Sequence, residues 1–173
     1  RHARQRADPA AVDGQHEEED DAEDRDCATG EGQRPCAEPG REVAEVIKSP
    51  KGWGIGLHGY DVRERAPWMD DAAHIRLPAS HQDQVITPPP GAKTILSSDF
   101  TEHAGLLYPG GTTLSVQPHP EFSVGYALAC CEMAHSKGQA PDGLVAAAKT
   151  SLADPLENAR LGGAITRFLT RSR

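Results

Sequence analysis

The hydrophobic pattern divides the chain near residue 43. Residues 1–45 contain no Leu, Ile, Met, Phe, Tyr or Trp. Such a segment cannot bury enough apolar surface to offset the ~1–2 kcal/mol of backbone entropy that each ordered residue loses. We therefore expect residues 1–42 to form a disordered acidic segment and residues 43–173 to fold as one domain. An acidic interaction tail is the functional alternative for the first segment.

Beyond residue 43, short apolar runs separated by Gly, Pro and polar residues predict several β-strands. Trp53, Ile55 and Leu57 alternate with glycine and polar positions, which is typical of a strand. Two further runs, at residues 104–108 and 112–117, are joined by a Pro-Gly-Gly turn and predict a hairpin. A short apolar stretch begins at residues 43–47, and shorter strands are expected at residues 75–77, 85–86 and 92–96.

The period changes to that of a helix after residue 121. Apolar side chains recur at helical spacing at Phe122, Tyr126, Cys130 and Met133, and Gly138 is a suitable C-terminal stop. We expect Cys130, Cys131 and Met133 to pack inside the domain.

Two more helices are predicted in the last third of the chain. One starts after Asp142, whose carboxylate can cap it, and runs to about Leu152. Pro155 suits the first turn of the other, which continues through Leu161 and Phe168 to the end of the chain. Strands followed by helices around one core indicate an α/β layered domain.

Charge and composition limit the classes of partner that this chain is expected to bind. Residues 1–45 carry 14 acidic and 6 basic side chains, whereas residues 46–173 carry 12 of each. Neither part is basic, so nucleic acid is not expected as a partner. No apolar run approaches the ~18–20 residues that span a membrane. The cysteines form no Cys-x-x-Cys pair, which is typical of free thiols in the cytoplasm; they are Cys27, Cys36, Cys130 and Cys131.

The sharpest candidate for chemistry is the pair His119 and Glu121, at the end of a predicted strand and just before a helix. In extended geometry two residues at this spacing project to the same side. A carboxylate that holds a histidine fixes its tautomer and stabilises its charged form, as in the general-base half of a nucleophilic triad. A surface hydrogen bond and a metal site without an obvious third ligand are the alternatives. The remaining histidines without evident partners are expected to be solvated: His58, His74, His103 and His135.

Three ordered blocks surround this pair: KSPKGWGIG at residues 48–56, SHQDQV at 80–85 followed by PPPGA at 88–92, and VQPHPEF at 116–122. Together they resemble class I glutamine amidotransferases of the GMP-synthase-like kind. The resemblance covers residues 43–173. It implies an incomplete flavodoxin-like, three-layer αβα domain.

The resemblance also implies roles for individual residues. His119 would activate a cysteine thiol and later protonate the leaving ammonia, and Glu121 would orient His119. Ser80, His81 and Gln82 would line the pocket for glutamine, mainly through their backbone, although ordinary loop residues are the alternative for this segment. A synthetase that accepts ammonia would be a partner, and no cofactor or metal is implied.

The chain departs from the family at the nucleophile, which lies in a Gly-x-Cys-x-Gly-x-Gln turn ahead of the first block. Cys36 lies between Pro35 and Pro39 with no apolar strand before it, and the acidic neighbours of Cys27 would raise a thiol pKa. The nucleophile is therefore missing or disrupted, and we expect a glutamine amidotransferase-like protein with little activity. A non-catalytic module that binds glutamine or a partner is one alternative, and a γ-glutamyl peptidase-like hydrolase is another.

Overall fold

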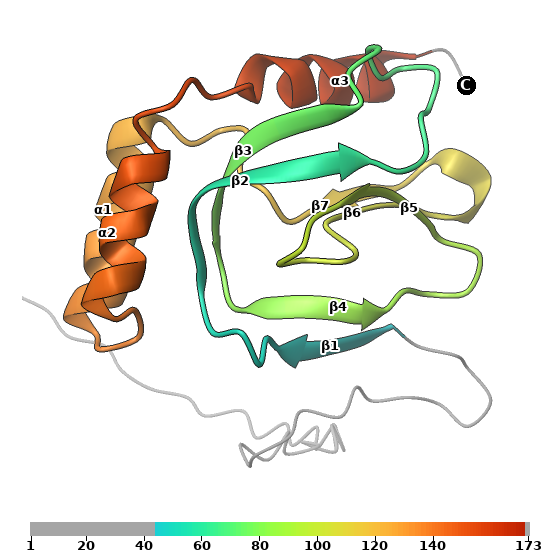
Figure 1. The fold of residues 1–173 in the computed structure, drawn as a ribbon. Helices are drawn as coiled ribbons and strands as arrows, with labels where there is room; N and C mark the ends of the chain where they lie inside the picture. The colour runs from blue at the N-terminus through green and yellow to red at the C-terminus, as the bar shows by residue number, and fades with distance from the viewer. Residues whose placement is uncertain (1–43, 172–173) are drawn as a thin grey trace, which may run out of the picture. The chain divides into compact units, whose positions relative to one another are not determined.

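The structure, a computed structural model, describes residues 44–171, so the segment predicted to be disordered lies outside the described residues. Strands come first along this part of the chain and helices last, as expected (Figure 1). Its elements are β1 (Glu45–Lys48), β2 (Gly54–Val62), β3 (His74–His81), β4 (Asp83–Thr87), β5 (Lys93–Ser97), β6 (Gly105–Leu107), β7 (Leu114–Val116), α1 (Val124–Ser136), α2 (Asp142–Ser151) and α3 (Asn158–Thr170).

The strands form a five-stranded sheet in the order β3-β2-β5-β6-β7 and a separate pair, β1-β4. Every strand pair within residues 44–171 is antiparallel. The longest pairing joins β2 to β3, from Gly54 opposite His81 to Asp61 opposite His74. The predicted hairpin is confirmed, because Leu106 of β6 lies opposite Ser115 of β7.

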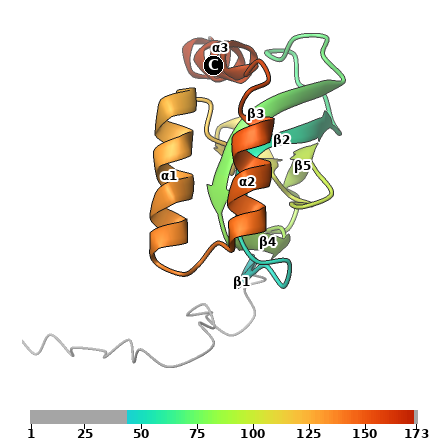
Figure 2. The same ribbon diagram turned by 60° about the vertical axis from the view of Figure 1, so that its left-hand side comes forward.

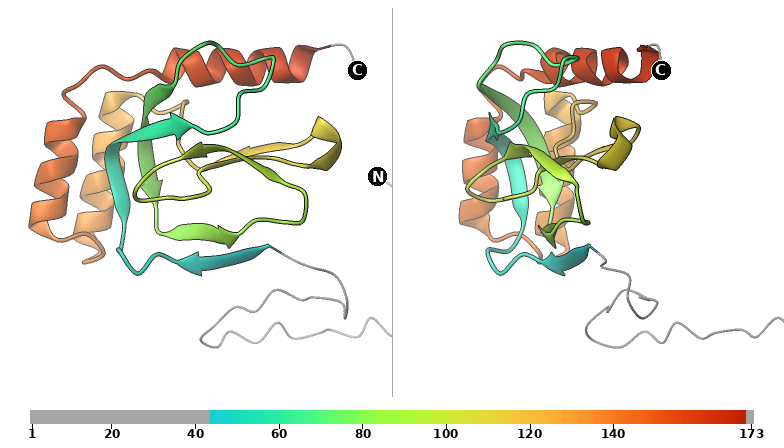
Figure 3. Two further views of the ribbon diagram at one scale, coloured as in Figure 1. Left: turned by 45° about the vertical axis from the view of Figure 1, so that its right-hand side comes forward. Right: turned by 90° about the vertical axis from the view of Figure 1, so that its right-hand side faces the viewer.

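Helices cover both faces of β2. Successive side chains of a strand point to opposite faces. Ile55 packs with α1 and α2, whereas Tyr60 packs with α3. Figures 2 and 3 show α1 and α2 side by side against the curved strands β2 and β3, with α3 running along a different side. The predicted layered α/β class is therefore confirmed.

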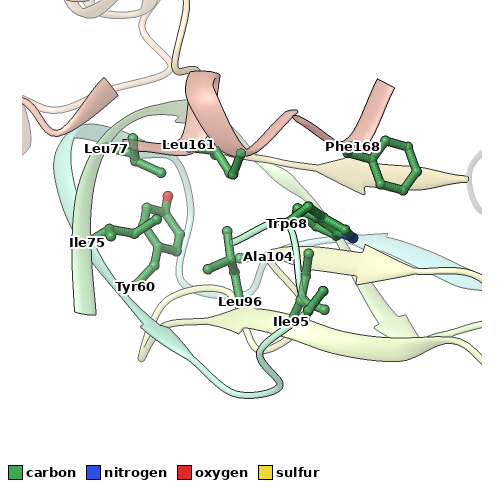
Figure 4. Packing of buried hydrophobic residues seen from close by; sticks show 11 residues of the cluster. Tyr60, Trp68, Ile75, Leu77, Ile95, Leu96, Ala104, Leu161 and Phe168 are labelled. Carbon is green, nitrogen blue, oxygen red and sulfur yellow. The ribbon is translucent and has the colours of Figure 1, made fainter. Parts of the chain in front are cut away.

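The larger core lies between the sheet and α3 (Figure 4). The ring of Trp68 meets the ring of Phe168 edge-on, with centroids 5.1 Å apart. Leu161, Ala164 and Phe168 follow the spacing of one helix face, and all three are buried. The sheet contributes Tyr60, Ile75, Leu77, Ile95 and Leu96 to this core.

The second core depends on Gly56 of β2, where α2 comes very close to the strand. A Cβ atom at Gly56 would lie 2.7 Å from the Cα of Ala148, and the φ angle of Gly56 is 93°. The hydroxyl of Ser151 accepts a hydrogen bond from the main-chain N–H of Leu57, at 2.9 Å. Only glycine satisfies both the backbone conformation and the close approach.

The predicted packing face of α1 is partly wrong. The buried residues of this helix are Ala127, Cys131 and Ala134. Tyr126 is 56% exposed and Met133 is 50% exposed. The helix packs through its small side chains, which allow close approach to β2 and α2, and the larger apolar stripe points outward. The expectation is confirmed for Cys131 and wrong for Met133.

Two helix starts also differ from the prediction. The N-cap of α2 is Pro141, and no side chain caps this helix. The carboxylate of Asp142 instead lies 3.4 Å from Nε2 of His135, so it does not cap the helix. The third helix begins at Asn158, after Pro155 rather than around it. The stop at Gly138 is confirmed by its φ of 67°.

Candidate functional site

His119 lies in the short connection between β7 and α1, and its backbone is attached to β3. Its main-chain N–H donates a hydrogen bond to the carbonyl of Pro78, at 2.9 Å. The preceding residue, Pro118, is buried. The position of His119 is therefore set by the five-stranded sheet as well as by the helix that follows.

The predicted contact between His119 and Glu121 is confirmed. Nδ1 of His119 lies 2.7 Å from Oε1 of Glu121. The predicted extended geometry is wrong, because the N–H of Phe122 donates to the carbonyl of His119 at 3.1 Å and closes a turn. Pro120 stands at the second position of that turn, which its fixed φ angle favours.

This contact determines which nitrogen of the ring is available. An ionised carboxylate only accepts hydrogen bonds, so Nδ1 of His119 carries the hydrogen and donates it to Glu121. In the neutral ring, Nε2 is then left with a lone pair. Burial opposes the ionisation of Glu121, but the hydrogen bond from His119, a backbone hydrogen bond and the charge of His119 together outweigh it and lower the pKa of this carboxyl. The His119 side chain is 30% exposed, so the ring can be reached from solvent.

Aromatic packing fixes the plane of the His119 ring. It stacks on Phe122 with centroids 4.1 Å apart and an angle of 12° between the rings. Tyr126 meets Phe122 edge-on, at 4.6 Å. The side-chain amide of Asn158 donates to the carbonyl of Phe122 at 2.7 Å and holds the turn against the start of α3.

Ser80, His81 and Gln82 lie at the end of β3 and in the turn to β4. This is the strand on which His119 is docked, two residues before Ser80. The carbonyl of Gln82 accepts a hydrogen bond from the N–H of Ser49, at 2.8 Å. The structure thus brings this segment close to the His119–Glu121 pair, and its role in binding stays a prediction.

His81 of this segment lies near His58 of β2, and the sequence did not predict that these two half-buried histidines lie together. The rings of His58 and His81 both meet the ring of Phe100 edge-on, at 5.4 Å and 5.7 Å. Gly54 makes room for that ring, since a Cβ there would lie 2.3 Å from Cε1 of Phe100. A sequence signal exists in β2, where Gly54 and His58 are separated by an even number of residues and both lie against Phe100.

Burial changes the acid–base behaviour of both histidines. It lowers the pKa of His58, against a smaller raising effect of the hydrogen bond with the carbonyl of Ile55. Burial also lowers the pKa of His81, and the positive charges of His58 and His119 lower it further. His58 is therefore not solvated, contrary to the prediction.

The other three histidines each have a partner, although His74 and His135 are exposed to solvent as predicted and His103 is half-buried. The contacts join Nδ1 of His74 to Asp61 at 3.0 Å, Nδ1 of His103 to Thr94 at 2.7 Å, and Nδ1 of His135 to the carbonyl of Ala140 at 3.0 Å.

No thiol of the described part serves His119. Cys131 is buried on the inner face of α1, and burial raises the pKa of its thiol. Cys130 is half-buried on the same helix. Within residues 44–171 no hydrogen bond joins either cysteine to His119, and no cluster of three or more His, Cys, Asp or Glu side chains could hold a metal. Cys27 and Cys36 lie outside the described residues.

A hollow of about 390 Å³ lies elsewhere, near the ends of β2 and β5. Its lining is mostly charged or hydroxylic and includes Asp61, Arg63 and Glu102. Neither His119 nor Glu121 lines it, and we do not assign it to the same site. None of the described helices is long and apolar enough to cross a bilayer.

Solved structures share this fold. A glutamine amidotransferase from Thermotoga maritima matches with a TM-score of 0.53 and 18% identity, over 74% of this chain and 56% of that one. A glutamine amidotransferase from Methylobacillus flagellatus matches equally well, with a TM-score of 0.53 and 18% identity over 73% and 55%. A putative GMP synthase protein from Thermoplasma acidophilum has a TM-score of 0.43. No family model and no curated protein matches the chain.

The first two matches show that the domain has a glutamine amidotransferase-like fold. The chain spans little more than half the length of those two proteins, 56% and 55%. At this identity the likeness concerns the fold, and chemistry has to be argued from the side chains.

Proposed function

We propose that residues 43–173 are part of a class I glutamine amidotransferase domain in which His119 is the general base and Glu121 orients it. The observation that carries this proposal is the 2.7 Å contact between Nδ1 of His119 and Glu121, in a turn docked on β3. This contact leaves Nε2 with the lone pair that a base needs. The glutamine amidotransferase-like fold supports the choice of substrate.

The reaction converts glutamine and water into glutamate and ammonia. Nε2 of His119 takes the proton of a thiol, and the thiolate attacks the carbonyl carbon of the glutamine side chain. His119 then gives the proton to the leaving ammonia as the carbon–nitrogen bond breaks. Water, deprotonated by the same nitrogen, hydrolyses the thioester and restores the thiol.

Ser80, His81 and Gln82 are the proposed glutamine-binding segment. They continue β3 directly after Ala79, close to the position where the His119 backbone is attached. A substrate held there by backbone groups would lie beside the base. The supporting observation is this shared attachment to β3.

No thiol within residues 44–171 completes the proposed site. Cys131 is buried, and Cys130 lies ~9 Å along the helix axis from the start of α1 at Val124. We therefore expect the chain alone to hydrolyse glutamine very slowly, because covalent catalysis supplies roughly 10⁶-fold or more. A synthetase that accepts ammonia is the proposed partner. The free thiols of Cys130 and Cys131 support a reducing compartment, the cytoplasm.

Burial of Cys131 favours a second candidate, a non-catalytic module that binds glutamine. Calorimetry of the full chain with glutamine, together with an assay for released ammonia, separates the two functions. The enzyme predicts slow ammonia release that His119→Ala abolishes and His135→Ala, an exposed control on α1, leaves intact. The binding module predicts glutamine binding without ammonia release. Absence of both binding and His119-dependent release would contradict the proposed site.

A further inference from the structure

One carbonyl joins the two segments of the proposed site. The carbonyl oxygen of Asp83 lies 3.0 Å from Nε2 of Gln117 and 3.1 Å from Nδ1 of His81. A carbonyl oxygen has two lone pairs and accepts both bonds at once. Gln117 stands two residues before His119, and His81 belongs to the segment at the end of β3. A single acceptor therefore ties one segment to the other.

This acceptor also selects the tautomer of His81. A carbonyl cannot donate, so Nδ1 of His81 carries the hydrogen, and Nε2 of the neutral ring has the lone pair. Nε2 faces the hydroxyl of Thr101, 3.5 Å away, which can donate to it. Thr101 is fully buried, and its N–H is bonded to the hydroxyl of Ser98 at 2.9 Å. Both ring nitrogens of His81 are thus matched to a neutral imidazole.

A neutral His81 suits the proposed role of His119. The charged groups that act on His81 are His58 from β2, His119 from the turn before α1, and Asp83 from β4. A positive charge on His81 would repel a proton that arrives on His119, and this repulsion is strong where solvent is partly excluded. Keeping His81 uncharged therefore preserves the ability of His119 to accept a proton.

The side-chain amide of Gln117 donates a hydrogen bond to the carbonyl of Asp83. Its backbone is anchored separately, since its N–H donates to the carbonyl of Ala104 at 2.8 Å. Its Oε1 is buried without a protein partner in the described part of the chain. The amide is therefore held in place by its donor group, and that donor goes to Asp83.

We propose that Gln117 is a positioning residue, whose side-chain amide holds the carbonyl of Asp83 and so keeps His81 as the Nδ1–H tautomer beside His119. The importance of this for catalysis rests on the proposed function. The hydrogen bonds of Gln117 and His81 do not depend on that function, so the positioning role and the proposed function can be tested separately.

The test reads the tautomer of His81 directly, by correlating the ring nitrogens and carbons in NMR spectra of the full chain near neutral pH. In the wild type we expect His81 to be almost entirely the Nδ1–H form. Gln117→Leu removes both polar groups, and Gln117→Glu keeps the shape and an acceptor but removes the donor. In each variant we expect the Nε2–H form of His81 to rise roughly 3- to 10-fold, the effect of losing one hydrogen bond. The tautomer of His58 should not change.

Leu161→Ala is the control for a merely structural effect, because it weakens the core under α3 without touching this network. It should leave the His81 signals unchanged. A wild-type His81 in the Nε2–H form would overturn the proposal without any variant. So would unchanged His81 signals in whichever Gln117 variants fold, or an equal change in Leu161→Ala. Loss of ammonia release in His119→Ala tests the proposed function independently of these spectra.

Discussion

Nδ1 of His119 lies 2.7 Å from the carboxylate of Glu121, although the two residues belong to a turn and not to a strand. The turn places the carboxylate against Nδ1 of the ring and leaves Nε2 without a contact to Glu121. The backbone of His119 is bonded to β3, so the pair is held by the sheet.

This pair should give a small, pH-dependent contribution to stability. The folded state lowers the pKa of Glu121 from its ordinary value of 4.5, since burial is outweighed by the combined effect of the hydrogen bond from His119, a backbone hydrogen bond and the charge of His119. A lowered carboxyl pKa adds stability above the unfolded value, and this stability disappears as the pH falls through the folded value. In Glu121→Gln, the loss of unfolding free energy between about pH 7 and pH 3 should be smaller by up to ~0.5 kcal/mol, because the carboxylate is exposed.

Urea unfolding at the two pH values measures this difference. Glu102→Gln is the matched control, since its exposed carboxylate forms no hydrogen bond within residues 44–171. An identical acid dependence in Glu121→Gln and the wild type would mean that the pair does not persist in solution.

The half-buried histidines should make the domain sensitive to mild acid. Burial lowers the pKa of His58 from its ordinary value of 6.5. For a base with a lowered folded pKa, stability is complete above the unfolded value and declines as the pH falls below 6.5 toward the folded value. The urea midpoint should therefore drop between about pH 7.5 and pH 5.5, and it should drop less in His58→Gln.

Alanine substitutions at Gly56 and Gly52 distinguish the cost of backbone strain from the cost of a packing clash. Both have a positive φ, 93° and 82°, but a Cβ at Gly52 would meet nothing within 4 Å. Gly52→Ala should cost about 1–2 kcal/mol of unfolding free energy, from strain alone. Gly56→Ala should cost about 1–3 kcal/mol more, because its Cβ would press on the backbone of α2 at Ala148. Equal costs in urea unfolding would show that α2 moves aside freely.

The contact of α3 with the sheet should depend on its buried side chains. Leu161 is 2% exposed in the larger core, whereas Leu169, on the same helix, is 73% exposed. Leu161→Ala should lower the unfolding free energy by about 2–5 kcal/mol. Leu169→Ala should change it by less than about 0.5 kcal/mol. Similar losses for the two variants would place α3 differently from the structure.

Much of this architecture is readable from local patterns. The alternation around Ile55 predicts β2, and the glycines of the 109–111 turn predict the hairpin that β6 and β7 form. Gly138 ends α1 as expected. The His119–Glu121 contact is predicted from a spacing of two residues, although a turn and not an extended segment brings the two side chains together. Each of these features is decided by neighbours in sequence, where propensity and spacing act directly.

Other features depend on contacts that no local pattern contains. Both faces of α1 are apolar, so its period cannot tell whether Met133 or Cys131 is buried. The close approach of α2 decides in favour of the smaller side chains. The grouping of His58 and His81 around Phe100 requires the register between β2 and β3 and the path of the 98–101 loop. The bond from Gln117 to Asp83 uses a main-chain carbonyl, which side-chain motifs do not reveal.

Because Ile55 and Tyr60 lie on one strand and support different helix layers, neither layer can be removed cleanly. A fragment that ends before α3 would leave Tyr60 and Leu77 facing water, while the same strand still held α1 and α2. Such a fragment would expose an apolar sheet face and would be expected to self-associate, not to persist as a smaller domain. Cooperative unfolding of both layers is thus a consequence of a single shared strand.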